Sequence, residues 1–164
     1  MNMTLHDKGP VRPPPVLAPV LQALSVTVQR WRGVAGATHW RFDAPDEIDG
    51  ADFYLGVREL GHIHLDGWVH IPASPPLRSA LVANKLAGPF RWGDRDDGWI
   101  EYFVATQSDS DHARWLFRLN LDRLRGVAIE RQLARVSARS SPRSITAHRR
   151  TPSDRPASAG SRRS

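Results

Sequence analysis

The sequence predicts a single α+β domain, in which a mostly antiparallel sheet packs with helices. Two observations favour this class: segments rich in β-branched and aromatic residues lie in the middle of the chain, and segments with helical periodicity flank them rather than alternating with them. A length of 164 residues allows one domain of ordinary size with tails. We expect a flexible proline-rich arm at residues 1–16, the domain at residues 17–126, and a basic, mostly disordered tail at residues 127–164.

The first half of the domain is expected to hold a helix and then several strands. The prolines at positions 13–15 favour an extended arm before it. Apolar residues at helical spacing predict a helix from about Leu17 to Trp31. Between Thr38 and Ile71, alternating apolar and polar residues punctuated by glycines predict short strands.

The pair Asp66-Gly67 predicts a hairpin with a two-residue turn. In that register Ile63 lies opposite His70 and His62 lies opposite Ile71, and directly opposed residues share a face of the sheet. His62 and His64, two residues apart on a strand, then share one face, and His70 falls on the other. A three-histidine metal site built from this hairpin is therefore not expected.

The second half is expected to hold two helices around one strand. Ser74 and Pro75 are typical of a helix start, and Gly88-Pro89 is expected to close that helix. The aromatic and branched run from Trp99 to Val104 predicts a largely buried strand. Capping residues from Ser108 to Asp111 and an apolar face predict a final helix that ends at Gly126.

Composition excludes several classes of protein. The chain has no cysteine, which excludes disulfide scaffolds, cysteine nucleophiles and zinc–cysteine sites. No apolar run approaches the roughly 20 residues that cross a bilayer, so neither a membrane span nor a membrane partner is expected. A cytoplasmic protein is the simplest expectation.

The positive charge is concentrated at the end of the chain. The formal net charge is +6, and the segment from Gly126 onward carries nine arginines against one glutamate and one aspartate. Such a tail could make weak, sequence-indifferent contacts with nucleic acid, and the simpler alternative is a solvated disordered segment. The arginines concerned are Arg131, Arg135, Arg139, Arg143, Arg149, Arg150, Arg155, Arg162 and Arg163.

The most distinctive motif is Glu-Leu-Gly-His-Ile-His at positions 59–64, followed by the Asp66-Gly67 turn. It resembles the luciferase-domain family, whose members carry a Glu-Leu-Gly-His-x-His segment, a turn, an x-x-Pro segment, a helix and a Gly-Trp strand. Pro72 and Gly98-Trp99 stand here at the corresponding places. The resemblance extends over residues 51–125.

The resemblance implies a small α+β domain similar to that of fungal luciferases, enzymes that oxidise a hydroxylated pyrone with molecular oxygen. It implies catalytic roles for His62, His64, Glu59 and Asp66, which match the family pattern. Three places depart from that pattern. His70 stands where an aspartate is usual, Leu65 where a glycine is common, and Phe90-Arg91 where two histidines are frequent.

Three interpretations of the pair His62 and His64 remain open. Neutral imidazoles could take a proton from an acidic enol at neutral pH. They could instead be structural and hydrogen-bond a carboxylate such as Glu59, or they could be a metal-ligand pair completed by a carboxylate such as Glu101. No metal or cofactor is assigned from the sequence.

Aromatic residues near the motif suggest a small-molecule ligand. Trp68, Trp92 and Trp99 could wall a pocket for a flat aromatic molecule, or they could fill the core. His70 and Glu101 complete the candidate substrate-binding set. The resemblance to the luciferase-domain family implies an oxygen-dependent oxidoreductase on a small aromatic or enolic substrate. The alternative is a non-catalytic module of the same fold that binds a small ligand or a protein.

Overall fold

The structure, a computed structural model, describes residues 8–44, 46–91 and 98–140. Within these ranges a six-stranded, fully antiparallel sheet packs with four helices, which confirms the predicted α+β class. The strands lie in the order β1-β2-β3-β4-β6-β5. The helices are α1 (Pro19–Gln29), α2 (Pro75–Ala83), α3 (Gln107–Leu124) and α4 (Ile129–Ser140). The strands are β1 (Val34–Trp40), β2 (Ile48–Leu55), β3 (Arg58–His64), β4 (Trp68–Pro72), β5 (Gly88–Pro89) and β6 (Trp99–Phe103).

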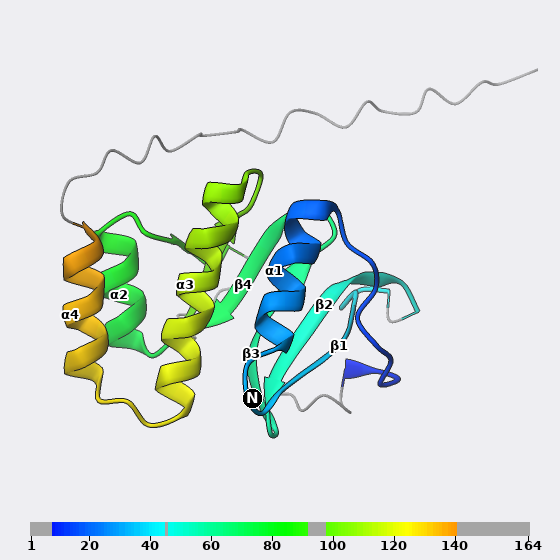
Figure 1. Ribbon diagram of the computed structural model, residues 1–164, viewed down its shortest axis with the longest axis horizontal. Coiled ribbons are helices and arrows are strands. Elements are labelled where there is room, and N and C mark those ends of the chain that lie inside the picture. Colours follow the sequence, from blue (N-terminus) through cyan, green and yellow to red (C-terminus); the bar gives the residue numbers. More distant parts are fainter. Residues whose placement is uncertain (1–7, 45, 92–97, 141–164) are drawn as a thin grey trace, which may run out of the picture.

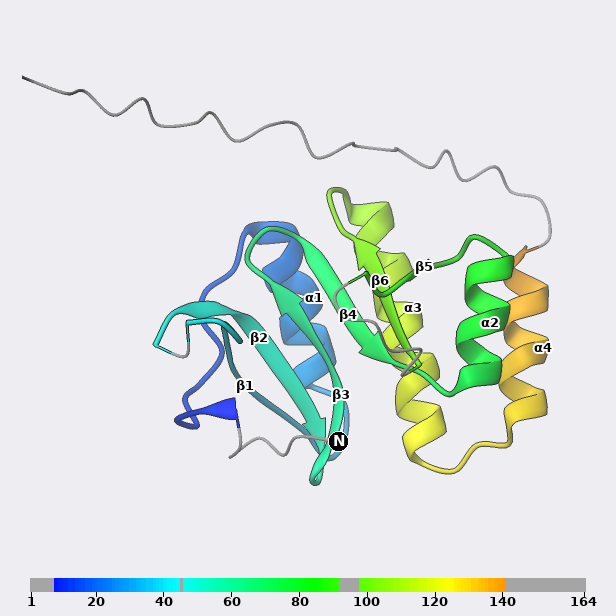
Figure 2. The same cartoon turned by 180° about the vertical axis from the view of Figure 1, so that it is seen from behind.

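One face of the sheet carries the hydrophobic core. Helices α1 and α3 lie side by side against it, and α2 and α4 pack together beyond α3 (Figure 1). Phe53 of β2 and Phe117 of α3 are fully buried, and their rings meet edge to face with centroids 5.6 Å apart. Because side chains alternate along a strand, the neighbours of Phe53 point to the opposite face, which lies in front of α1 and α3 in Figure 2.

Local chemistry explains where the helices begin. Pro75 occupies the first turn of α2 after Ser74, but the Ser74 hydroxyl makes no capping hydrogen bond. Helix α3 begins one residue before the predicted capping region. The side chain of Thr106 accepts from the backbone N–H of Asp109, and the Asp109 carboxylate accepts from the backbone N–H of Thr106, which forms a capping box.

The ordered chain extends further than expected at its C-terminal side. Residues 129–140, which we expected in the tail, form α4 because Val136 and Gln132 are buried where the helix packs on α2 and α3. Residues 141–164, with six of the tail arginines, lie outside the described part of the chain. No helix among the described residues is both long and apolar enough to span a membrane.

The arm is tied to the sheet over its described part. The backbone N–H of Thr38 donates to the carbonyl of Arg12, and the indole of Trp40 donates to the carbonyl of Pro10 at 3.0 Å. The arm therefore runs beside β1, the edge strand, as Figure 1 shows.

The β3–β4 hairpin differs from the prediction by one residue. His62 lies opposite His70 and Ile63 opposite Val69, so the predicted two-residue turn is wrong. Three residues, 65–67, form the loop, in which the N–H of Gly67 donates to the carbonyl of His64 at 3.2 Å. Gly67 has a φ of +102°, the left-handed conformation that ends a three-residue hairpin loop. This shift moves His70 onto the same face as His62.

Candidate functional site

A row of polar side chains crosses the sheet on the face opposite the core. The pairs Asp52–His62, His62–His70 and His70–Glu101 are each directly opposed on neighbouring strands. Directly opposed residues share a face, so strands β2, β3, β4 and β6 each contribute one member of the row. All four residues are buried.

A bulge in β3 adds Glu59 to this face. Phe53 pairs with Gly61 but Tyr54 pairs with Glu59, so Leu60 is an extra residue in β3. An inserted residue reverses the alternation of the side chains that precede it. As a result Glu59 reaches His62, and its Oε1 lies 2.7 Å from the ring nitrogen Nδ1.

A glycine lets two further histidines approach each other. Gly50 lies between His39 of β1 and His64 of β3 in the register of the sheet. Because Gly50 has no side chain, the rings of His39 and His64 come within 4.9 Å, centroid to centroid. The ring of His39 also stacks on that of His62 at 4.0 Å with an angle of 11°. We call His39, His62, His64 and His70 the four-histidine cluster.

Carboxylates fix the orientation of three of these rings. The Nδ1 atoms of His39, His62 and His64 lie 3.0, 2.7 and 2.8 Å from carboxylate oxygens. These oxygens belong to Asp52, Glu59 and Asp49, respectively. An ionised carboxylate only accepts hydrogen bonds, so each Nδ1 carries a proton, and a ring that is neutral keeps its lone pair on Nε2.

The lone pairs of His62 and His64 converge on His70. Its Nδ1 lies 3.1 Å from Nε2 of His62 and 2.9 Å from Nε2 of His64. Ring nitrogens of three imidazoles from two adjacent strands therefore lie close together, around Nδ1 of His70. On the other side of its ring, His70 meets the edge of Phe90, with centroids 4.8 Å apart.

One ammonium group offsets part of the negative charge beneath the cluster. Nζ of Lys8 lies 3.2 Å from Asp52 and 2.9 Å from Glu59. Burial raises the pKa of Glu59 to about 7, against the opposing effect of the Lys8 charge. The fully buried Asp52 accepts from both Lys8 and His39, so this carboxylate holds the arm and β1 together.

Burial favours the neutral form of His62, His64 and His70. It lowers the pKa of His70 to about 3, and it moves the pKa of His62 well below its usual value. The pKa of His64 is lowered too, chiefly by burial and then by the charge of His39, although Asp49 acts in the opposite direction. Neutral rings can accept a proton or coordinate a metal ion through their free nitrogen.

The structure brings most of the sequence-predicted site residues together. Glu59, His62, His64 and His70 are in direct contact, and the ring of Trp99 lies 5.6 Å from that of His62. Glu101 is opposite His70, but its carboxylate binds Nε of Arg91 at 2.9 Å.

Two predicted residues lie apart from the cluster, and one lies outside the described chain. Asp66 is exposed in the hairpin loop and accepts from the backbone N–H of Trp68 at 3.2 Å. Trp68 packs against Phe103, with ring centroids 5.2 Å apart. Trp92 falls outside the residues that the structure describes.

Sequence reasoning missed His39, Asp49, Asp52 and Lys8. Asp49 and Asp52 lie within the otherwise apolar strand 48–55, and a charged residue in such a strand is a sign of a buried partner. For Lys8 and His39 no local pattern gives a signal, because the arm and β1 reach the cluster only through tertiary packing.

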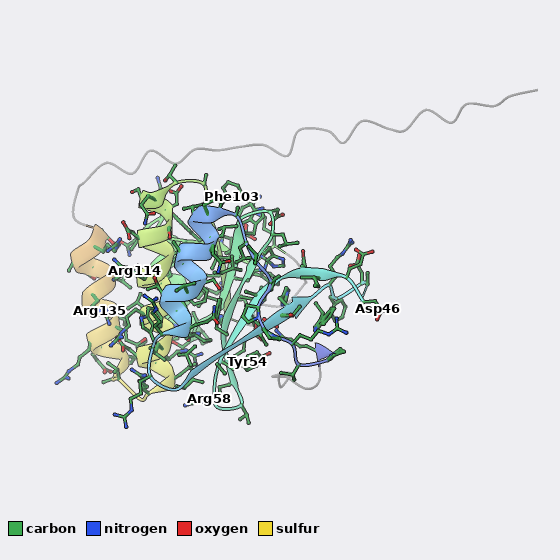
Figure 3. All side chains as sticks on the ribbon, turned by 45° about the vertical axis from the view of Figure 1, so that its right-hand side comes forward. Asp46, Tyr54, Arg58, Phe103, Arg114 and Arg135 are labelled. Carbon is green, nitrogen blue, oxygen red and sulfur yellow. The ribbon has the colours of Figure 1, made fainter. Side chains whose placement is uncertain are left out.

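A separate groove lies on the helical side of the molecule. It has a volume of about 550 Å³ and is lined by residues of α1, α3 and α4, including Trp115 and Arg139, and by Trp31, which follows α1. Arg114, which also lines it, is labelled on the helical side in Figure 3, together with Arg135. This groove is shallow and does not include the four-histidine cluster.

The fold and the site define a class of protein: an antiparallel α+β domain with carboxylate-bound imidazoles buried on one sheet face. Residues 57–120 match the family model of the Luciferase domain, so this part of the chain contains a luciferase domain. The match runs from the turn before β3 into α3 and excludes Lys8, His39, Asp49 and Asp52. No curated protein and no solved structure matches the chain.

Proposed function

We propose that the protein is an oxygen-dependent oxidoreductase that acts on a small aromatic or enolic molecule at the four-histidine cluster. Two findings support the proposal. A luciferase domain is present, and such domains in fungal luciferases oxidise a hydroxylated pyrone. The cluster supplies neutral imidazoles with a defined protonated nitrogen and a free lone pair, which is the form of histidine that acts as a base.

The proposed reaction begins with proton transfer. The enol O–H gives its proton to Nε2 of His64, and Asp49 stabilises the imidazolium that forms. The electron pair of the enolate carbon then forms a C–O bond with molecular oxygen, which is reduced to the peroxide level. The imidazolium returns the proton to the terminal oxygen, and the product is a hydroperoxide of the substrate.

His64 is the member of the pair that a substrate reaches first. Its side chain is 16% exposed, whereas that of His62 is 10% exposed. The substrate would take the place of His70 as the hydrogen-bond partner of Nε2 of His64. Because burial lowers the pKa of His64, the base is weak, so only an acidic enol or phenol is expected to react.

The observation that carries the proposal is the Asp49–His64 pair, in which the carboxylate at 2.8 Å orients the ring. The test is oxygen consumption by the full chain with a panel of hydroxypyrones and catechols. We expect turnover with at least one compound and at least a 100-fold loss in His64→Gln, since general-base catalysis contributes about 10²–10⁴-fold. His112→Gln, which changes a buried histidine outside the cluster, is the matched control and should retain turnover.

The alternative is a binding module without chemistry. One observation favours it: the Nε2 atoms of His62 and His64 already have a hydrogen-bond partner in His70, as in a structural hydrogen-bond network. A ligand that binds in titration calorimetry without oxygen uptake would support this alternative and refute the oxidoreductase proposal. Unchanged turnover in a folded His62→Gln/His64→Gln double variant would also refute the proposal that the oxidation takes place at the four-histidine cluster.

A further inference from the structure

Two distances between ring nitrogens of the cluster are compatible with ligands of one metal ion. Two nitrogen ligands, each about 2.0–2.1 Å from an ion and at right to tetrahedral angles, lie about 2.9–3.4 Å apart. The distances from Nδ1 of His70 to Nε2 of His62 and of His64 are 3.1 and 2.9 Å. One ring nitrogen from each of His39, His62 and His64 also lies within 4.8 Å of the other two.

The outer hydrogen bonds match those of metal-bound histidines. A histidine that binds a metal through one nitrogen almost always donates the other N–H to a carboxylate or carbonyl, which fixes the ring and its tautomer. His39, His62 and His64 each have a carboxylate oxygen within 3.0 Å of Nδ1.

The local charge favours a cation. Asp49, Asp52 and Glu59 contact the imidazoles, and Lys8 contacts two of these three carboxylates. The buried surroundings of the rings are therefore net negative when all three carboxylates are ionised. A divalent ion bound by neutral imidazoles would offset the excess.

A second candidate group in the same region is already occupied. Asp52, Glu59 and His62 are close enough to hold an ion, but the ammonium of Lys8 lies at 3.2 Å from Asp52 and 2.9 Å from Glu59. The imidazole nitrogens on the other side of the His62 ring have no such cation among the described contacts. The imidazole side of the cluster is thus the better place for a metal.

We propose that the four-histidine cluster binds one divalent first-row transition-metal ion. His62 and His64 are its central ligands, with His39 and His70 on either side of them. Imidazole ligands suit zinc, copper, iron and nickel rather than magnesium or calcium. The ion would bind at the site of the proposed oxidation. Only a role of the ion in that reaction rests on the proposed function, because metal binding is measured without turnover.

The experiment is metal binding by the full chain, purified without a histidine tag and stripped with a chelator. Zn²⁺ and Co²⁺ are titrated by calorimetry, and the visible d–d absorption of Co²⁺ reports nitrogen coordination. We expect one ion per chain, displacement of Co²⁺ by Zn²⁺, and no binding of Mg²⁺. Failure to bind either transition ion would overturn the proposal.

Variants assign the ligands. The double variant His62→Gln/His64→Gln should lose the Co²⁺ spectrum, whereas His112→Gln should keep it. Asp49→Asn keeps all four imidazoles and changes a half-buried carboxylate, so it should fold, and we expect 10–100-fold weaker binding. Equal affinity in the double variant and the wild-type protein, with folding confirmed by circular dichroism, would place the ion elsewhere and refute the assignment.

The two proposals fail separately. Oxygen uptake that persists at full rate after chelation would refute a role for the ion in the oxidation and leave the oxidoreductase proposal standing. One tightly bound ion per chain, with no oxygen uptake for any substrate of the panel, would support the metal site and count against the oxidoreductase. A structure determined with added Zn²⁺ that shows the imidazole hydrogen bonds intact, and neither metal nor water in the cluster, would also refute binding.

Discussion

His112 is a buried histidine outside the cluster, and burial is the main cause of its protonation state. Its Nε2 donates to the carbonyl of Leu86 at 2.6 Å, and its Nδ1 accepts from Nε of Arg139 at 3.2 Å. Burial lowers its pKa against the opposing effect of the hydrogen bond to Leu86, and the charge of Arg139 lowers it further against the smaller effect of Asp109. The ring is therefore neutral at pH 7, as its contact with Arg139 requires.

This lowered pKa predicts a pH-dependent contribution to stability. The folded protein binds fewer protons at His112 than the unfolded chain, so the stabilising effect is complete above the unfolded value near 6.5 and is lost as the pH falls toward the folded pKa. The free energy of unfolding lost in His112→Gln should thus be larger at pH 7.5 than at pH 5. Urea unfolding at several pH values measures it, and a difference that stays constant would contradict the prediction.

For individual residues, the sequence predicted part of the site. The spacing of His62 and His64 placed both rings on one face, because alternation along a strand is a local property. The position of His70 could not be obtained in the same way, since it depends on whether the loop has two or three residues. Lys8 lies 44 positions from its partner Asp52, and only the folded chain brings the two together.

Among the elements, β2 depends most on a residue without a side chain. Gly50 has a φ of +156°, and a Cβ atom at this position would lie 1.9 Å from the backbone carbonyl oxygen of Ile63. Backbone cannot move aside as a flexible side chain can. The strand pairing of β2 with β3, and the approach of His39 to His64, both require glycine here.

We therefore expect Gly50→Ala to destabilise the protein by about 2–4 kcal/mol and to weaken metal binding. Gly56→Ala is the matched control, because Gly56 also has a positive φ, +62°, but no atom lies within 4 Å of the added Cβ. The control should cost only about 1 kcal/mol, the backbone strain alone. Chemical unfolding of both variants compares the two costs, and equal destabilisation would contradict the steric argument.

The sequence predicted most elements because their signals are local. Helices α1 and α3 and strand β6 lie close to their expected positions. Helix α2 begins as expected but ends at Ala83, and Gly88–Pro89, which we expected to close it, form β5. Helix α4 was missed because Val136 and Gln132 are its only buried residues. Its arginine-rich sequence is therefore typical of a solvated segment. Its folding depends on tertiary packing, above all against α2, which lies far from it in the sequence.

For the whole molecule, the core residues among those described span positions 17–136, and residues 141–164 have a serine-, arginine- and proline-rich composition that offers few apolar side chains to bury. A chain that ends at Ser140 should therefore unfold at the same urea concentration as the full chain. Circular dichroism during urea titration measures this, and a lower midpoint for the shortened chain would mean that residues 141–164 contribute to stability.

The same shortened chain tests the basic tail as a nucleic-acid contact. It lacks six arginines, so phosphate contacts made there would give the full chain a steeper decrease of DNA affinity with salt. An equal salt slope for both chains would exclude residues 141–164 from DNA binding. Any remaining slope would then belong to the folded part, where Arg114 and Arg135 lie on the helical side in Figure 3.

The contact of the N-terminal arm with β1 has a practical consequence. Lys8 neutralises buried carboxylates, and residues just after it cover the outer edge of the sheet through Arg12 and Pro10. A protease that cut after Lys8 would remove the counter-ion, and a cut after Arg12 would also detach the residues that cover the edge strand. Fusion partners for imaging or capture therefore belong behind Ser140, where their linkers leave the electrostatic balance of the interior unchanged.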